Sequence, residues 1–397
     1  MKLKPWYPAL VGTVCQVFGI GLIGVFSFFV APLSREFGVG VATINVGAVF
    51  LLLAPAVVGP VVGRFVDSHS IRSIMLIGVM LATSSLYGLS MAASLGLAGA
   101  GFFAYAVGQT LYGPLVLNSL LIKTYQENVA TALAVAAMGV SVGAVLLPFL
   151  IAWLMDQFSW RETLQVLAMG IALVLLLTVR LGLPRFPRAP ENDDSLPPAA
   201  QLDKDFLRAP AFWIIGVAIA IIFNMALMVG VCYAPHFGQQ GFANSTIATF
   251  MAAGGVAGFT AKLLVASFVD RWRNYLKSIA VGVVFIKILG MGALLWGDSF
   301  ATNMLGVALI GGSGGAFLPL YPYLNSRYFD AASIGGVNGA QAPLLLPLGL
   351  VSAPLAGYAF DIRGSYDMAF MGAIALLLGA ALLLAILPAS GQRVPEN

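Results

Sequence analysis

One lysine of this chain lies where a charged group is costly. Lys262 is part of the apolar run GGVAGFTAKLLVASFVDRWRN, residues 254–274, and precedes Asp270 by eight residues. In a helix those eight residues span roughly 12 Å, at about 1.5 Å per residue. With Asp270 at the surface of a hydrocarbon layer about 30 Å thick, the ammonium group lies near its middle. A charge there costs at least about 2.5 kcal/mol, so we predict that Lys262 belongs to a binding site and neutralises an anion.

Other polar side chains are predicted at a similar depth. Asn118 and Tyr321 each lie about seven residues inside one end of an apolar run, which is roughly 10 Å in a helix. Gln16 and Gln341 lie about nine and eight residues into their own runs, and Tyr112 lies on the same run as Asn118. Hydrogen-bonding groups around one cation are what a small organic anion requires. The alternative is that these side chains only bridge helices, at roughly 0.6 kcal/mol each.

Two further ionisable residues are candidates for coupling transport to protons. Lys287 lies ten residues after Lys277 and is therefore as deep as Lys262; it either pairs with backbone carbonyls or lines a crevice. His236 is either an interfacial side chain or a gating or proton-transfer group. An anion stabilises the charged form of a lysine, so anion binding and protonation of Lys262 can be linked. That linkage predicts H⁺ symport, or else exchange of two anions.

The composition places these residues in a membrane protein. The chain of 397 residues is 60% hydrophobic and 9% charged, with a mean hydropathy of +0.94, whereas a soluble domain carries roughly 25% charged residues. The net charge of +4 is spread along the sequence, which argues against nucleic acid as a partner. Neither the two cysteines nor the two histidines have the spacing of a metal site or a catalytic triad. We expect no enzyme activity, no metal and no cofactor.

Twelve apolar segments are long enough to cross a bilayer as helices. A segment rich in proline and charge separates the sixth from the seventh and cannot bury enough apolar surface to fold alone. The sequence thus predicts an all-α membrane protein of two six-helix bundles, residues 1–182 and 210–397, joined by a linker over 183–209. The twelve segments are 7–31, 43–66, 73–93, 97–122, 129–155, 162–182, 211–235, 245–269, 278–297, 301–325, 333–359 and 367–388.

The distribution of positive charge predicts the orientation. With the N-terminus inside, fifteen lysine and arginine residues lie on the cytoplasmic side, whereas three lie outside. We therefore expect an integral protein of the bacterial inner membrane with both termini in the cytoplasm, acting as a monomer.

The two halves also resemble each other in sequence. GRFVD at 63–67 matches ASFVD at 266–270, an offset of 203 residues (270 − 67), and Tyr125 corresponds to Tyr328 at the same offset. An internal duplication of this kind places a transport site between the repeats, near the middle of the membrane.

The segment GRFVDSHSIRS, residues 63–73, resembles the loop between the second and third helices of the major facilitator superfamily. Gly63, Asp67 and Arg72 match that motif, while Ser68 and Ser70 replace the usual arginine and glycine. The resemblance implies twelve helices, alternating access, and a gating role for Gly63, Asp67 and Arg72. Asp270 and Arg271, at the end of the matching segment in the second half, are assigned to the same gating group.

PLSREFG at 32–38, SWRET at 159–163 and GSYDMAF at 364–370 resemble the branch that holds monocarboxylate transporters and the oxalate:formate antiporter. In that branch a cation, usually arginine, precedes the aspartate that ends helix eight by eight positions, which is the position of Lys262. A lysine keeps the charge but not the bidentate geometry of arginine. Gly258 stands where proton-coupled monocarboxylate transporters carry an aspartate, and the antiporter's second cation has no counterpart.

The expected function is secondary transport of a small organic anion. All sixteen acidic residues fall in loops or at helix ends, whereas transporters of protons with cations or drugs generally need a buried carboxylate. One alternative is an exporter of amphiphilic compounds, which the aromatic residues Phe26, Phe28 and Phe29 favour. A non-transporting membrane sensor or scaffold is a second alternative.

Overall fold

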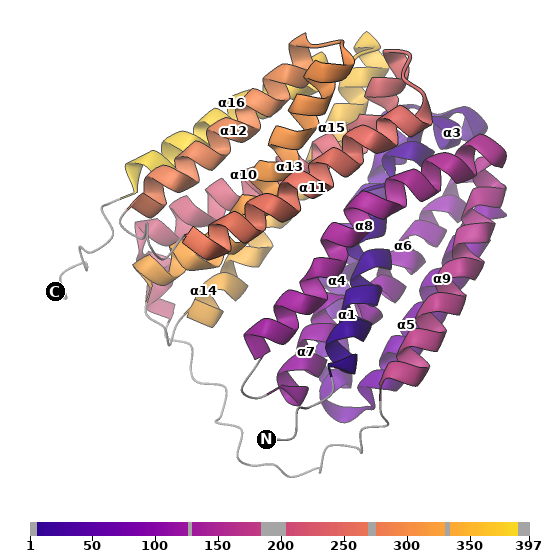
Figure 1. Cartoon of the computed structure of the whole chain (residues 1–397), viewed down its shortest axis with the longest axis horizontal. Coiled ribbons are helices and arrows are strands. Elements are labelled where there is room, and N and C mark those ends of the chain that lie inside the picture. Colours follow the sequence, from indigo (N-terminus) through magenta and orange to yellow (C-terminus); the bar gives the residue numbers. More distant parts are fainter. Residues whose placement is uncertain (1–5, 126–128, 184–203, 269–274, 330–333, 388–397) are drawn as a thin grey trace. The chain divides into compact units, whose positions relative to one another are not determined.

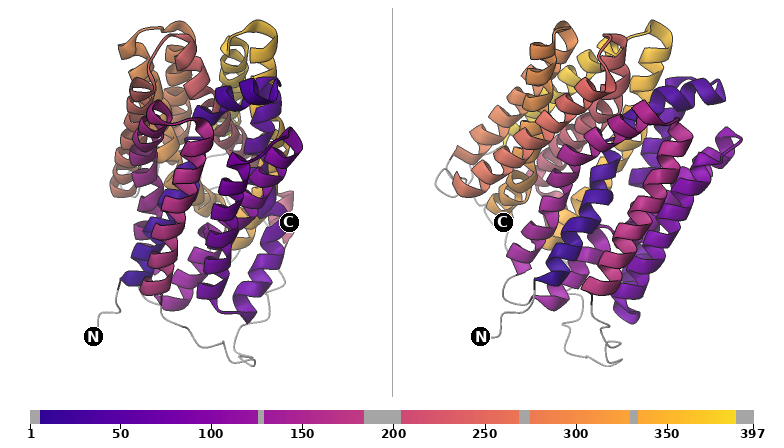
Figure 2. Two further views of the ribbon diagram at one scale, coloured as in Figure 1. Left: turned by 90° about the vertical axis from the view of Figure 1, so that its right-hand side faces the viewer. Right: turned by 45° about the vertical axis from the view of Figure 1, so that its right-hand side comes forward.

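The computed structural model describes residues 6–125, 129–183, 204–268, 275–329 and 334–387, and these are almost entirely helical. Two compact units divide the chain: unit 1 comprises residues 1–192 and 233–252, and unit 2 comprises 193–232 and 253–397. Within each unit the helices run side by side along a common direction (Figures 1 and 2). The predicted domain boundaries at 182 and 210 stay a prediction.

Within the described residues, each of the twelve predicted apolar segments is helical over most of its length, but three are interrupted. The first is divided into three helices, the fourth breaks at Gly113, and the eleventh breaks at residues 342–344. By length and apolar composition, ten of the described helices can cross a membrane, and the bent pair 7–23 and 27–37, at 49°, makes eleven. The fourth segment, divided at Gly113, is not among them.

Unit 1 contains nine helices and one end of two more. Ser159 begins the last of the nine with a capping box, its hydroxyl accepting from the Glu162 amide while the Glu162 carboxylate accepts from the Ser159 amide. The helices are α1 (Tyr7–Phe18), α2 (Ile20–Ile23), α3 (Ser27–Phe37), α4 (Val41–Ser68), α5 (Ile71–Ser90), α6 (Leu95–Tyr112), α7 (Pro114–Thr124), α8 (Val129–Gln157) and α9 (Trp160–Gly182).

Two long helices pass from one unit to the other, and the remaining elements belong to unit 2. The 3₁₀ turn η1 (Lys204–Arg208) precedes α10, and η3 (Ala342–Leu344) separates α14 from α15. The helices are α10 (Pro210–Gln239), α11 (Asn244–Phe268), α12 (Leu276–Trp296), α13 (Phe300–Tyr328), α14 (Ile334–Gln341), α15 (Leu345–Arg363) and α16 (Asp367–Ile386).

The two units repeat the same packing. In unit 1, α5 packs against α6 and α9; in unit 2, α12 packs against α13 and α16 in the same way. Thr13 of α1 donates to the Val135 carbonyl of α8 at 2.8 Å. Asn224 of α10 donates to the Leu345 carbonyl of α15, also at 2.8 Å. These pairs are offset by 211 (224 − 13) and 210 (345 − 135) residues, close to the offset in the sequence motifs.

We refer to the end of each unit that carries its short turns as the turn end. In unit 1 these turns lie at 38–40, 91–94, 158–159 and 240–243, and in unit 2 at 297–299 and 364–366. Gly38, Gly241 and Gly364 adopt positive φ angles of 62°, 83° and 69° at three of these turns, a conformation that favours glycine. The opposite end of each unit is the linker end.

Candidate functional site

Gln341 is the centre of a hydrogen-bonded cluster in unit 2. Its side chain is fully buried, with 0% exposure. Its Oε1 accepts from the Tyr321 hydroxyl at 3.1 Å and from Asn325 Nδ2 at 2.7 Å, and its Nε2 donates to the Phe212 carbonyl at 3.0 Å. Asn325 Nδ2 also donates to Asn338 Oδ1 at 2.7 Å. The cluster therefore ties α10, α13 and α14 together.

Breaks in the helices place this cluster. Gln341 is the last residue of α14, where the chain turns through η3 into α15. Pro319 and Pro322 on either side of Tyr321 remove two amide donors from α13. Two predicted site residues, Tyr321 and Gln341, are thus brought into direct contact.

Lys262 lies on α11 at the level of Tyr321. Glycines bring α11 and α13 into backbone contact, since a Cβ added at Gly315 would overlap the Gly258 carbonyl. Lys262 lies four residues beyond Gly258, about 6 Å, and Tyr321 lies six beyond Gly315, about 9 Å. Both helices run from the turn end to the linker end, so the two side chains differ by only about 3 Å along the bundle.

Lys262 faces the more covered side of its helix. Its side chain is half-buried, whereas the adjacent Leu263 and Leu264 are exposed. Among the residues that the structure describes, every carboxylate belongs to a helix end or a turn. The interiors of the described helices therefore carry the lysines Lys262 and Lys287 but no acidic residue.

A second group of polar side chains lies in unit 1, where two helices break side by side. The Tyr112 hydroxyl, at the end of α6, donates to the Phe18 carbonyl at the end of α1, at 3.3 Å. Gln16 is buried, and its Oε1 has no partner among the described residues. Gln109 is buried as well, and its side chain makes no hydrogen bond in the described part of the chain. Tyr112 therefore bridges two helices, while both glutamines keep hydrogen-bonding capacity.

Asn118 is placed differently from the other predicted site residues. It lies on α7, four residues beyond its first residue, Pro114, and its side chain is exposed. That side chain makes no hydrogen bond within the described ranges. An exposed amide on an apolar helix is available to a ligand.

The two candidates for proton coupling have well-defined surroundings. Lys287 is fully buried on α12, and its Nζ donates to the Ile222 carbonyl of α10 at 3.1 Å. Of the two predicted alternatives, the structure therefore has the pairing with a backbone carbonyl. His236, near the turn end of α10, is buried, with its Nε2 3.3 Å from Gln240 Nε2 and its ring 5.3 Å from that of Phe237.

The gating motif is described only in part. Gly63 lies in α4, and Asp67 lies in the last turn of the same helix. Arg72, in the first turn of α5, donates through Nη2 to the Arg180 carbonyl of α9 at 2.7 Å, which joins those two helices at the linker end. Asp270 and Arg271 lie outside the described residues.

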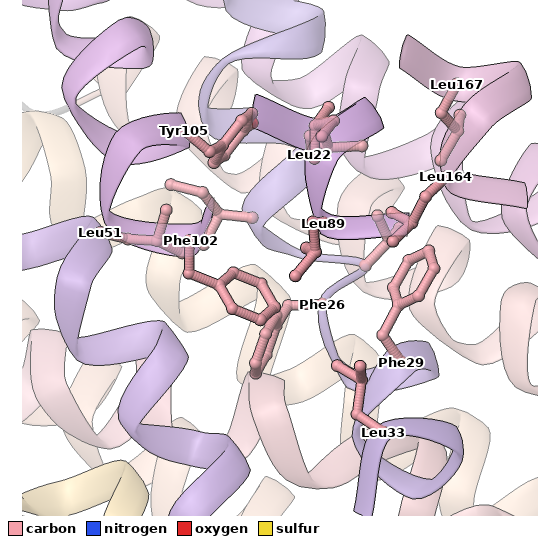
Figure 3. Close-up of a pocket in the computed structure, with 13 residues that line it drawn as sticks. Leu22, Phe26, Phe29, Leu33, Leu51, Leu89, Phe102, Tyr105, Leu164 and Leu167 are labelled. Atoms are coloured by element: carbon pink, nitrogen blue, oxygen red, sulfur yellow. The ribbon is translucent and has the colours of Figure 1, made fainter. Parts of the chain in front are cut away.

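An apolar cavity lies beside the bend between α2 and α3 in unit 1 (Figure 3). Phe26 and Phe29 line it, and Phe26 meets Phe102 edge to face, with ring centroids 5.4 Å apart. Its volume is about 50 Å³, whereas pockets for drug-sized ligands measure about 300–1,000 Å³. Phe28 is buried but does not line this cavity.

Sequence reasoning missed several members of these clusters. Asn325 follows Tyr321 by four residues and Asn338 precedes Gln341 by three, so each shares a helix face with its partner. This spacing is the sequence signal that could have identified Asn325 and Asn338 as members of the cluster. Gln109 carries a weaker one, since it is an amide three residues before Tyr112 in an apolar run.

Comparison with known proteins gives consistent matches over nearly the whole chain. The profile of the Major Facilitator Superfamily matches residues 9–349. An MFS-type transporter of Gibberella moniliformis is 25% identical, covering 97% of this chain and 90% of its own length. Monocarboxylate transporter 12 of Xenopus laevis is 24% identical, covering 78% and 73%. The fujikurins efflux protein of Gibberella fujikuroi is also 24% identical, covering 82% and 70%.

The fold matches solved transporter structures. The nucleoside transporter NupG superposes with a TM-score of 0.73 over 97% of this chain and 98% of its own, at 15% identity. An identity this low supports the fold and says nothing about the transported compound.

Proposed function

Because this chain belongs to the Major Facilitator Superfamily and is a secondary transporter of the membrane rather than an enzyme, we propose that its cargo is a small organic anion, such as a monocarboxylate. The observation that carries this proposal is the charge distribution. Lys262 supplies a positive charge inside α11, six residues before the last residue of that helix, whereas the described carboxylates lie at helix ends and turns. A cation carrier would need the opposite arrangement.

In each unit, polar side chains are assigned a part in binding. Lys262 attracts the carboxylate as a point charge. Tyr321 lies at the same level, and its hydroxyl donates to Gln341 Oε1. When an anion binds beside Lys262, this hydroxyl exchanges the Gln341 acceptor for the anion and orients it. In unit 1 the candidates for binding cargo are Asn118 and Gln16, which have unused hydrogen-bonding groups in the described chain.

This assignment changes the role of two predicted site residues. Gln341 uses its amide oxygen and nitrogen within the protein, and Tyr112 donates its hydroxyl to a carbonyl. We therefore propose that both position other groups and do not touch the cargo. Lys287, already bonded to the Ile222 carbonyl, is assigned a structural role.

Transport is coupled through Lys262. A charged ammonium group in the membrane interior is costly, and its charged form is stabilised when an anion binds beside it. The protein therefore carries anion and proton together, or exchanges one anion for another. Uptake that ignores both pH gradients and counter-anions would contradict coupling of either kind.

The test is flux into proteoliposomes, with labelled acetate, lactate and pyruvate as probes. We expect Lys262→Gln to abolish uptake and Lys262→Arg to retain part of it. Lys277→Gln is the matched control, because Lys277 donates to the Leu387 carbonyl at the linker end and lies away from the site. A bound anion should also raise the unfolding temperature of the wild type but not of Lys262→Gln.

The runner-up function is export of an amphiphilic compound, as the name of the fujikurins efflux relative illustrates. The cavity at Phe26 and Phe29 would be its site, but about 50 Å³ is too small for such a molecule. Export of this kind predicts that Lys262→Gln leaves flux intact, so the same variant separates the two functions.

A further inference from the structure

A long groove follows α15 in unit 2, between α10 and α16. Its volume is about 460 Å³, about nine times that of the cavity in unit 1. The lining is apolar except for Ser352, Tyr358 and Arg363. The residues that line it are Met225, Met228, Leu348, Ser352, Leu355, Ala356, Tyr358, Ala359, Ile362, Arg363, Met368, Ala369, Gly372, Ala373 and Leu376.

The groove has the dimensions of a lipid tail. From Leu348 to Arg363 it follows fifteen residues of helix, roughly 22 Å, whereas one leaflet of the hydrocarbon core is about 15 Å thick. Leu355, Tyr358 and Ile362 are 59%, 58% and 63% exposed, so the groove is open along its length. Methionines from α10 and α16 line it, and their flexible side chains adapt to a chain of variable shape.

Two residues of opposite charge lie where the groove reaches the turn end: Arg363 lines it, and Asp367 directly precedes the lining residue Met368. Arg363 is the last residue of α15 and Asp367 the first of α16, and both are exposed. Neither side chain makes a hydrogen bond or an ion pair within the described part of the chain, and the two do not pair with each other. A ligand that carries both a negative and a positive group complements this end of the groove.

We propose that the groove binds a phospholipid whose headgroup is zwitterionic and donates hydrogen bonds, as phosphatidylethanolamine does. One acyl chain lies along α15 from Arg363 toward Leu348. The guanidinium group of Arg363 donates to the phosphate in a bidentate arrangement. The ammonium group of the lipid donates to the Asp367 carboxylate. Phosphatidylcholine has no N–H donor, and phosphatidylglycerol has no positive charge, so both fit this end of the groove less well.

The headgroup is tested by native mass spectrometry of the full-length protein, titrated in detergent with phosphatidylethanolamine, phosphatidylcholine or phosphatidylglycerol. We expect the wild type to retain phosphatidylethanolamine at about tenfold lower concentration than phosphatidylcholine, which is the usual size of one charge-assisted hydrogen bond. Asp367→Asn should abolish that preference and leave phosphate binding intact. Arg363→Gln should weaken the binding of all three lipids. Arg35→Gln, at the turn end of unit 1, is the control and should change nothing.

The acyl chain is tested separately with two glycine variants of α16. A Cβ added at Gly372 or at Gly379 meets no atom within 4 Å, so both positions have open space for a first side-chain atom. Gly372 lines the groove and Gly379 does not. Gly372→Leu should therefore weaken lipid binding, whereas Gly379→Leu should not.

Three results would overturn the proposal. Equal retention of the three lipids by the wild type would show no headgroup selection. Unchanged binding in Gly372→Leu would show that no chain lies in the groove. Displacement of the lipid by inorganic phosphate or by phosphoethanolamine at comparable concentration would show an anion site rather than a lipid site.

Discussion

Replacing Gln341 by leucine tests whether this residue holds the site together or touches the cargo. The substitution keeps the volume nearly constant but removes the three hydrogen bonds at 3.1, 2.7 and 3.0 Å to Tyr321, Asn325 and the Phe212 carbonyl. Side-chain hydrogen bonds between membrane helices average about 0.6 kcal/mol, with a maximum of about 1.7. Three of them give a loss of about 2 kcal/mol, and no more than about 5, in the free energy of unfolding.

Thermal unfolding in nanodiscs and transport kinetics in proteoliposomes separate the two roles. As a positioning residue, Gln341→Leu should lower the unfolding temperature by several degrees and raise KM because Tyr321 loses its support. Gln109→Leu is the matched control, since that buried amide makes no hydrogen bond in the described chain and its loss should cost little stability. An unchanged unfolding temperature together with a raised KM would refute this reasoning and make Gln341 a ligand.

Three further predictions concern stability and coupling. Gly315→Ala should destabilise the protein by about 1–3 kcal/mol, because its methyl group overlaps a backbone carbonyl of α11; Gly314→Ala, which meets nothing within 4 Å, should be neutral in the same thermal assay. Arg161→Gln should lower the unfolding temperature more than Glu36→Gln. Arg161 donates to the Ser90 and Ala92 carbonyls, at 2.6 and 3.1 Å, as well as to the Glu36 carboxylate at 2.8 Å. Equal effects of the two substitutions would show that only the ion pair matters. Lys287→Met should keep both flux and its pH dependence, since removing a buried charge relieves its desolvation cost; a variant that transports without responding to pH would assign the coupling to Lys287.

The fold could be predicted from sequence because the bilayer leaves few alternatives. Each apolar run had to be helical, since only helices and closed barrels satisfy their backbone groups in lipid. The positions of the breaks were less accessible. Gly113–Pro114 and Pro343 are sequence signals for a helix break. Whether such a signal kinks or interrupts a helix depends on neighbours that hydrogen-bond the freed carbonyls. The break after α1 is an example, because the Tyr112 hydroxyl donates to the Phe18 carbonyl there.

The depth of the candidate site residues could be predicted from sequence, but their hydrogen-bond partners could not. Helical rise placed Lys262 and Tyr321 in one layer, and the glycine contact between α11 and α13 is consistent with that level. Rise alone could not tell which amide binds another side chain and which is unused. Gln341 and Asn118 were both predicted as amides at a similar depth in an apolar run. In the structure the Gln341 side chain is buried and hydrogen-bonded, whereas the Asn118 side chain is exposed. That difference comes from the rotation of each helix about its axis, which only packing decides.

The backbone contact between α11 and α13 has a consequence for the transport cycle. At Gly258 and Gly315 the backbones of these helices touch with no side chain between them, so we expect the pair to move as one rigid piece when access switches from one side of the membrane to the other. The ammonium of one helix and the phenol of the other then keep a constant separation throughout the cycle. If Lys262 and Tyr321 bind the cargo as proposed, it would be recognised by the same geometry on loading and on release, and selectivity would be independent of the direction of flow.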